Sequence, residues 1–127
     1  MSDDASTPHV ELGFVLDCRD PGALAPFWAA ALRYMTVGGV DNYTLLTPDG
    51  RDGPNLLLQR VPEAKATKNR MHFDLHTADV ETEASRLEAL GARRLEDQTM
   101  HEHGSSWIRM ADPEGNEFCV CDGGGDC

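Results

Sequence analysis

The sequence predicts an α+β fold made of two copies of one β-α-β-β-β unit. Strand-like alternation followed by a capped helix occurs twice along the chain. The two copies also share one spacing: Phe73 minus Phe14 is 59, and Asp79 minus Asp20 is 59. Two landmarks at one offset indicate an internal duplication. With 127 residues, 40% of them hydrophobic, the chain suits a single domain over residues 1–127.

The first copy opens with a strand and a helix. Leu12, Phe14 and Leu16 alternate with other residues, which predicts a strand with one apolar face. Asp20 followed by Pro21 is a helix start, because aspartate caps the first amides and proline suits the first helical position. The helix carries an apolar stripe that we assign to the core. The stripe residues are Leu24, Phe27, Trp28, Ala31 and Leu32. Pro26 either lies early in the helix or kinks it.

The second copy repeats this order. Met71, Phe73 and Leu75 alternate with polar residues, Asp79 is the second N-cap, and Gly91 suits the end of the helix. The predicted apolar stripe consists of Val80, Ala84, Leu87 and Leu90.

Each copy then ends in a strand-turn-strand pattern. The turns 47–50 and 112–115 both carry Pro and Gly. Residues 92–96 are the predicted second strand of the second unit, and its counterpart near 35–37 is short. We therefore predict a first module at about 9–60, a linker at 61–70, a second module at about 71–122 and a disordered tail at 123–127.

Charge and composition restrict the function. The net charge of −11 disfavours nucleic acid, because the eleven Lys and Arg residues are scattered. An acidic surface either favours cationic ligands or serves solubility alone. No apolar run reaches a membrane span, and the polar, acidic start does not resemble a signal peptide. We expect a cytoplasmic protein that binds neither membranes nor nucleic acid. Its four cysteines do not predict a disulfide framework.

The paired units, with Asp112–Asn116 reading Asp-Pro-Glu-Gly-Asn before the last strand, resemble the vicinal oxygen chelate superfamily (glyoxalase, bleomycin-resistance and extradiol-dioxygenase proteins). The resemblance covers about residues 9–122, and the segments 58–63 and 68–72 look like a glyoxalase-like branch. It implies that the curled mixed sheets of the two modules form a cup, whose floor commonly holds a divalent metal. It also implies a homodimer.

Strand phase predicts which side chains face the cup. Because alternate side chains point to opposite faces, residues between the core positions must face away from the helices. For the second module these are His72, Asp74 and His76 in its first strand, and Glu117, Cys119 and Cys121 in its last. The family pattern also turns Gln59 inward. Trp107 and Arg109 share one face of their strand and either line the cup or, for the tryptophan, pack in the core or a dimer interface.

By the resemblance, the family's metal ligands fall on Gly13, Gln59, His72 and Cys119. Glycine cannot ligate, and a cysteine stands where a carboxylate is usual, so the sequence departs from the pattern at two of four places. A zinc-type site could still be built from Gln59, His72 and either Glu117 or Cys119. The cysteines otherwise act as small buried hydrophobes. We expect no cofactor, with a divalent metal as the alternative.

Two functions remain open. The first is a protein that binds a small molecule in the cup without the family's complete metal centre. The second is a metal-dependent lyase, isomerase or dioxygenase-like enzyme that uses His72 as metal ligand or general base. The candidate ligand-binding residues are Gln59, His72, Asp74, Trp107, Arg109, Glu117 and Cys119. His101 and His103, in a predicted loop, either close over the ligand or are solvated.

Overall fold

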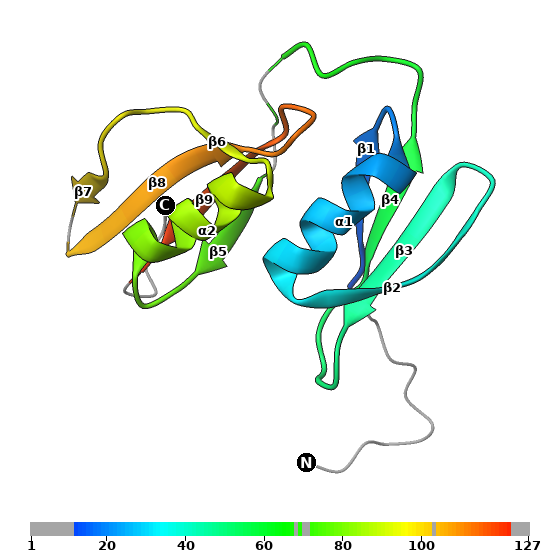
Figure 1. The fold of residues 1–127 in the computed structure, drawn as a ribbon, viewed down its shortest axis with the longest axis horizontal. Helices are drawn as coiled ribbons and strands as arrows, with labels where there is room; N and C mark the ends of the chain where they lie inside the picture. Colours follow the sequence, from blue (N-terminus) through cyan, green and yellow to red (C-terminus); the bar gives the residue numbers. More distant parts are fainter. Residues whose placement is uncertain (1–11, 68, 70–71, 103, 123–127) are drawn as a thin grey trace.

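The computed structural model describes residues 12–67, 69, 72–102 and 104–122. Two sheets lie side by side, each with one helix on the same face (Figure 1). The first module contains β1 (Phe14–Cys18), α1 (Pro21–Leu32), β2 (Tyr34–Val40), β3 (Tyr43–Pro48) and β4 (Leu56–Arg60). The second contains β5 (Phe73–His76), α2 (Val80–Leu90), β6 (Arg93–Arg94), β7 (Met100–Glu102), β8 (Ser105–Ala111) and β9 (Glu117–Cys121). The fold is α+β, as predicted.

The two sheets repeat one topology. Strand order is β1-β4-β3-β2 in the first and β5-β9-β8-β6 in the second, where β7 also pairs with β8. In both, the opening strand runs parallel to the last strand, and the other described pairs are antiparallel. Strands β1 and β5 are therefore the edges at which the two modules adjoin (Figure 1).

Both helices begin where the sequence predicts. The carboxylate of Asp20 accepts the amide of Ala23 at 3.2 Å, and that of Asp79 accepts the amide of Thr82 at 3.1 Å. Gly91 ends α2 with φ 120°, a value that favours glycine. Pro26 lies inside α1, which continues to Leu32.

Several predicted boundaries were wrong. The strand predicted near 35–37 extends over Tyr34–Val40 and contains a bulge between Thr36 and Gly38. The strand predicted at 92–96 is reduced to Arg93–Arg94, and the segment containing His101, predicted as a loop, forms β7. The extent of these short strands depends on how they pair with neighbouring strands, and local sequence propensity carries no information about that pairing.

Two predicted apolar positions are also exposed. Leu12 lies before β1 and Leu90 lies in the last turn of α2. Neither is covered by another element, so periodicity alone overestimates the core at element ends. Met71, His103 and the tail 123–127 lie outside the described residues.

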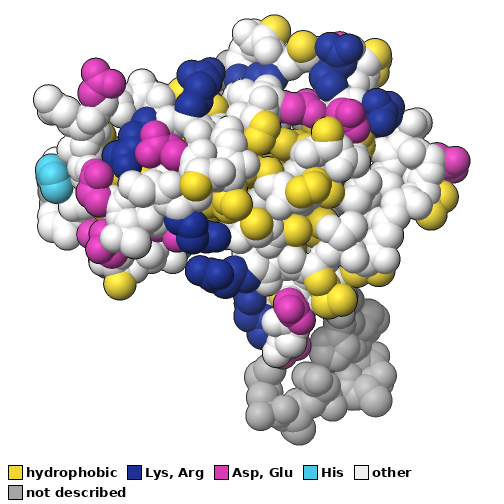
Figure 2. Space-filling model, viewed as in Figure 1, with side chains coloured by type: hydrophobic (Ala, Val, Ile, Leu, Met, Phe, Trp, Pro, Cys, Tyr) yellow, Lys and Arg dark blue, Asp and Glu magenta, His cyan; other side chains and the backbone are white. Residues whose placement is uncertain are grey.

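The core fuses the two modules. Trp28 of α1, 1% exposed, packs edge-on against Phe73 of β5 and Phe118 of β9, with ring centroids 5.4 and 5.1 Å apart. Phe27 packs against the same tryptophan at 5.0 Å. The predicted core assignment of Phe27 and Trp28 is thus confirmed. Apolar side chains collect where the modules meet on the helix side (Figure 2). Neither helix of the described residues has the length and hydropathy of a membrane span.

The Asp112–Asn116 turn joins the second module to α1. The Asp112 carboxylate accepts the indole N–H of Trp28 at 2.9 Å, and the Glu114 carboxylate accepts the amides of Arg19 and Asp20 at 2.6 and 2.9 Å. The Glu114 carboxylate therefore lies at the amino end of α1, where the helix dipole favours negative charge. The motif that carried the family resemblance has a structural role here.

The carboxyl end of α1 is held from the other module as well. The guanidinium of Arg86, on α2, donates to the carbonyls of Ala30 and Ala31 at 3.0 and 2.9 Å. These carbonyls lack partners within the helix, and a cation stabilises them. Because α1 is bound at both ends and in its middle by the second module, we expect the two modules to unfold together.

Candidate functional site

The seam between β1 and β5 is the centre of the candidate site. Phe14 and Phe73, which occupy equivalent positions in the two modules, contact each other with ring centroids 5.8 Å apart. A contact between equivalent residues places an approximate two-fold axis between them. Gly13 and His72, which precede these two residues, therefore flank the same axis.

The sheet surfaces opposite the helices form what we call the open face. In the second module, register places Asp74, Cys119 and Arg109 in one row, and His76, Cys121 and Trp107 in the next. These alternate with the core residues Phe118, Val120, Ile108 and Met110. Strand phase therefore predicted correctly that Asp74 and His76 face away from the core.

In the first module the open face is more apolar. One row contains Val15, Leu57 and Leu45, and the next contains Asp17, Gln59 and Tyr43. Val15 is 51% exposed and Tyr43 is 43% exposed, although both are large apolar residues. Gln59 thus shares a face with Leu57, as expected, but it lies in the first module, whereas His72 lies just before β5 of the second.

His72 is the central polar group of the open face. Its Nε2 lies 3.1 Å from Oδ1 of Asp74, and the two side chains are 41% and 31% exposed. A carboxylate at this distance fixes the orientation of the imidazole ring. The histidine lines a cavity of about 360 Å³ together with Phe14, Tyr34 and Phe73. His72 also lines a second, small cavity of about 30 Å³. The other lining residues include Asn116 and Glu117 of the same module and Val15 of the first module.

Cys119 completes a cluster with these two residues. One ligand atom each from His72, Asp74 and Cys119 lies within 4.8 Å of the others. Cys119 is a free, buried cysteine, and so is Cys18. Cys121 takes part in a disulfide bond, which the cysteine count did not predict. The similar group of Asp74, His76 and Cys121 therefore has no free thiol.

Arg109 is engaged by a residue that the sequence did not reveal. Its Nε donates to Oε1 of Glu96 at 2.7 Å, and its Nη2 donates to the same oxygen. This hydrogen bond raises the pKa of the guanidinium. Glu96 was predicted as the last residue of a strand at 92–96 but follows β6 in the structure, and strand prediction alone does not identify it as the partner of Arg109.

The remaining candidates lie farther along the open face. Trp107 is half-buried and pairs in register with Cys121 and Met100. The exposed His101 has its Nδ1 2.8 Å from the hydroxyl of Ser106. The structure places His101 in β7, beyond Trp107, rather than beside His72.

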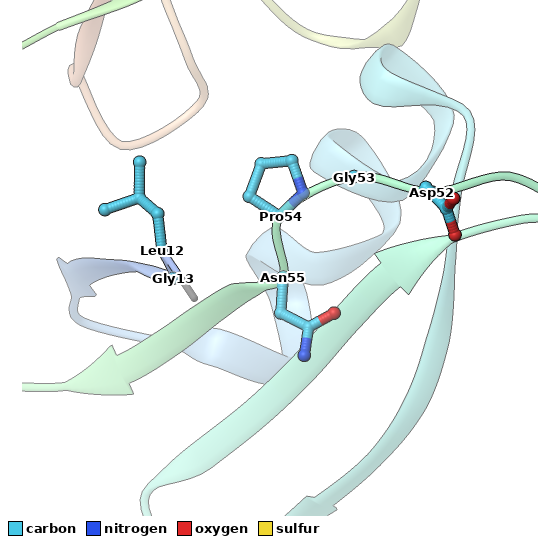
Figure 3. A pocket seen from close by; sticks show the side chains of 6 residues that line it. All are labelled: Leu12, Gly13, Asp52, Gly53, Pro54 and Asn55. Carbon is cyan, nitrogen blue, oxygen red and sulfur yellow. The ribbon is translucent and has the colours of Figure 1, made fainter. Parts of the chain in front are cut away.

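The family's metal positions are only partly suited to a metal. Gly13 lies beside Asn55 at the start of the first sheet and lines an open hollow of about 670 Å³ (Figure 3). A Cβ atom added at Gly13 would meet nothing within 4 Å. Packing therefore does not require glycine here, and there is space for a side chain at the position where the resemblance predicts a metal ligand. The four-residue set of Gly13, Gln59, His72 and Cys119 does not fit a metal.

A different set of donors does suit one. His72, Asp74 and Cys119 offer nitrogen, oxygen and sulfur from one module, and such a mixed set favours Zn²⁺ over harder ions. Asp74 was predicted as a ligand-binding residue rather than a metal ligand. Its place in the cluster follows from the pairing of β5 with β9.

The fold occurs in several solved structures. A glyoxalase/bleomycin resistance protein/dioxygenase family enzyme from Burkholderia phytofirmans superposes with a TM-score of 0.72 at 14% identity, covering 89% of this chain and 98% of that one. A lactoylglutathione lyase from Agrobacterium tumefaciens gives 0.63 at 20% identity, covering 92% and 96%. A variant of the fosfomycin resistance protein FosX from Listeria monocytogenes, complexed with Mn(II) and dihydroxypropylphosphonic acid, gives 0.68 at 12%, covering 85% of each chain.

Sequence comparison assigns the family. No functionally curated protein sequence matches the chain. Residues 13–121, nearly the whole described fold, match the family described as Glyoxalase-like domain. The chain therefore belongs to the Glyoxalase-like domain family, within the vicinal oxygen chelate superfamily.

Proposed function

We propose that this protein binds a small organic molecule on the open face at the seam of its modules, without the metal centre usual in its superfamily. Gly13 carries this proposal, because the residue that would supply a ligand there has no side chain although the site has room for one. Exposed apolar residues on one side of the seam and the His72–Asp74 pair on the other support a ligand site. We further propose that the protein is cytoplasmic and forms a homodimer.

Metal binding by the wild type and by Gly13→His tests this proposal. The added imidazole would flank the two-fold axis opposite His72, in open space. We expect wild-type protein purified without chelator to hold less than one divalent ion per chain. We expect Gly13→His to bind Zn²⁺ at least about tenfold more tightly, because a further ligand raises affinity. Calorimetric titration and elemental analysis measure both quantities. Gly22→His is the control, since Gly22 is exposed near the start of α1 and an added Cβ there makes only an ordinary contact at 3.7 Å.

The alternative is a metal-dependent lyase, isomerase or dioxygenase-like enzyme. The cluster of His72, Asp74 and Cys119 favours it, because three donors within 4.8 Å leave positions open for a substrate. A metal held there would act as a Lewis acid on a substrate oxygen. His72, oriented by Asp74, is the candidate base for moving a substrate proton.

One measurement separates the two functions. A stoichiometric divalent ion in the wild type that is lost in both His72→Ala and Cys119→Ser would contradict the metal-poor site and favour the enzyme alternative. Absence of a metal, together with saturable thermal stabilisation by a small molecule, would support the binding protein. Light scattering at several protein concentrations tests the homodimer.

A further inference from the structure

Exposed apolar side chains gather on one hairpin. Of the eight large apolar residues that are exposed in the described part of the chain, half lie on β2 and β3. They are Met35, Val37, Val40 and Tyr43, which we call the hairpin patch. The other four are distributed over β1 and the segment before it, α2 and β7. Single exposed apolar residues are ordinary on a protein surface, whereas a cluster of them marks a contact surface.

The hairpin patch lies at the end of the first sheet that is remote from the second module (Figure 1). The outer strand of this sheet is β2, and its partner among the described strands is β3. The second sheet ends at β6, which has two residues, both arginine. Short and charged edge strands resist docking, whereas β2 has seven residues and no charge. Of these two outer edges, that of the first module is therefore the one suited to contact.

A bulge leaves Val37 exposed within this edge. The register between β2 and β3 passes over it, because Thr36 pairs with Leu46 and Gly38 pairs with Leu45. Val37 is 57% exposed, and an added Cβ at Gly38 would meet nothing within 4 Å. Bulges often re-aim a side chain, and glycine inside a strand often marks the approach of another backbone. Because a bulge interrupts regular strand pairing, the edge favours contact through side chains over a continuous sheet across two molecules.

Charge favours a second copy of the chain as the occupant. The net charge is −11, yet neither β2 nor β3 contains a Lys, Arg, Asp or Glu residue. A basic partner would be attracted to the carboxylates elsewhere on the surface rather than to this uncharged hairpin. Two copies of an acidic chain repel each other where their charged surfaces meet, so they approach best where both are uncharged. An isologous contact, in which a patch faces the same patch across a two-fold axis, meets this condition on both sides.

The size of the hairpin suits a weak dimer. A typical stable interface buries about 800 Å² on each partner, which is about a tenth of the 8187 Å² accessible surface of this chain. The hairpin has seven residues in β2 and six in β3, also about a tenth of the chain. Leu46 and Pro48 of β3 are buried in the core side of the sheet, so the contact lies at or below the typical size. We therefore expect a micromolar dissociation constant.

We propose that the hairpin patch is the interface between two copies of this chain, in which each patch packs against the other about a two-fold axis. This inference rests on the homodimer proposed above and names its contact surface. The strands β4 and β1 lie between the hairpin and the seam. The dimer therefore leaves the seam accessible, and each ligand site is formed within one chain.

Sedimentation velocity tests this interface, over concentrations from about 1 to about 200 µM that bracket a micromolar Kd. Wild type should pass from the chain mass of 13.9 kDa toward twice that mass. Val37→Lys and Val37→Glu should each raise the Kd at least about thirtyfold, because an unpaired charge would be buried in an apolar contact. The matched controls are Leu90→Lys and Met100→Lys, which place the same charge on exposed apolar residues of the second module. They should leave the Kd within about twofold of wild type.

Two further measurements identify the occupant. An equimolar mixture of Val37→Lys and Val37→Glu should form a mixed dimer with a Kd at least about tenfold below that of either variant alone, because opposite charges then meet across the axis. Native mass spectrometry distinguishes the mixed dimer from the two homodimers. Raising the ionic strength from about 0.05 to about 0.5 M should tighten the wild-type dimer, since salt screens the repulsion between two chains of net charge −11.

The outcomes distinguish failure of the interface from failure of the homodimer. A wild-type dimer whose Kd is unchanged in both Val37 variants would overturn the interface and leave the homodimer standing. A dimer that salt weakens would do the same, because charged surfaces would then hold it together. A wild type that stays monomeric at every concentration would overturn both, and the hairpin patch would then belong to a different partner. Small-molecule binding at the seam is measured separately and stands or falls by itself.

Discussion

Replacing Asp112 with asparagine tests how the two modules are joined. The Asp112 side chain is buried, and each of its carboxylate oxygens accepts two hydrogen bonds. Oδ1 accepts the amides of Glu114 and Asn116 at 2.8 and 2.9 Å. Oδ2 accepts the indole of Trp28 and the side-chain amide of Asn116, both at 2.9 Å. Asparagine has nearly the same shape but only one acceptor oxygen. In either orientation, its NH2 group would therefore face two of the N–H groups that the carboxylate now accepts.

The expected loss of stability follows from these four bonds. Hydrogen bonds to a charged acceptor are each worth about 1.5–3 kcal/mol, so two lost bonds amount to about 3–6 kcal/mol. A neutral side chain is easier to bury than a carboxylate, which offsets part of this loss. We expect the free energy of unfolding to fall by about 2–4 kcal/mol, and the melting temperature by about 8–15 °C for a domain of this size.

Urea unfolding followed by circular dichroism and tryptophan fluorescence measures this change. Both signals should give one coincident transition in wild type, because α1 of the first module is bound to the second. Trp28→Phe should also be destabilising. The double variant should lose less than the sum of the single losses, by about 1 kcal/mol, since both changes remove the same bond.

Asp97→Asn is the control, because Asp97 is exposed; it should change stability by less than about 0.5 kcal/mol. A loss below about 1 kcal/mol in Asp112→Asn would refute the reasoning. So would separate transitions for the two signals in wild type, since these would show that the modules unfold independently.

Three further predictions concern the carboxyl end of α1, the Asp112–Asn116 turn and the buried thiol of Cys18. Arg86→Met should lower the unfolding free energy by about 2 kcal/mol at pH 7 because the carbonyl of Ala30 loses its partner. Arg86 also donates to Glu83 and lowers the pKa of that carboxyl group from 4.5, so the part of the stabilisation that comes from this ion pair is present above pH 4.5 and is lost on acidification. The difference in unfolding free energy between Arg86→Met and wild type, measured by urea titration, should therefore be smaller near pH 3 than at pH 7. Gly115→Ala should cost about 1–2 kcal/mol in the same assay, because φ is 89°. Burial, and secondarily the charge of Glu114, raises the pKa of Cys18 to about 11, so iodoacetamide at pH 8 should alkylate it at least about tenfold more slowly in native than in unfolded protein, as measured by mass spectrometry.

The arginine and glycine predictions each have a matched control. Arg93→Met removes an exposed arginine of the same module and should be neutral; an equal effect would mean that Arg86 acts only through net charge. Gly22→Ala lies in α1, where an added Cβ makes only an ordinary contact at 3.7 Å. It should be neutral or slightly stabilising, and an equal loss in both glycine variants would contradict the argument from φ. Rapid alkylation of native Cys18 would show that its thiol is neither buried nor protonated.

Local patterns in the sequence predicted much of the fold. Asp20 and Asp79 cap their helices as expected, because a side-chain cap acts within three residues. The orientation of Asp74 and His76 followed from alternation along one strand, which depends on no distant partner. The common offset of 59 residues predicted a repeated topology, and both sheets show it.

The sequence by itself thus determined the two modules, their helix starts and the face on which the polar residues of β5 lie. Only the tertiary structure showed that Glu96 binds Arg109, that Asp112 and Glu114 hold α1, and that Asp74 joins His72 and Cys119. Asp112 and Trp28 are 84 residues apart, and Glu114 and Arg19 are 95 apart. Periodicity reports only which way a side chain points, whereas such contacts depend on where the chain brings distant segments together.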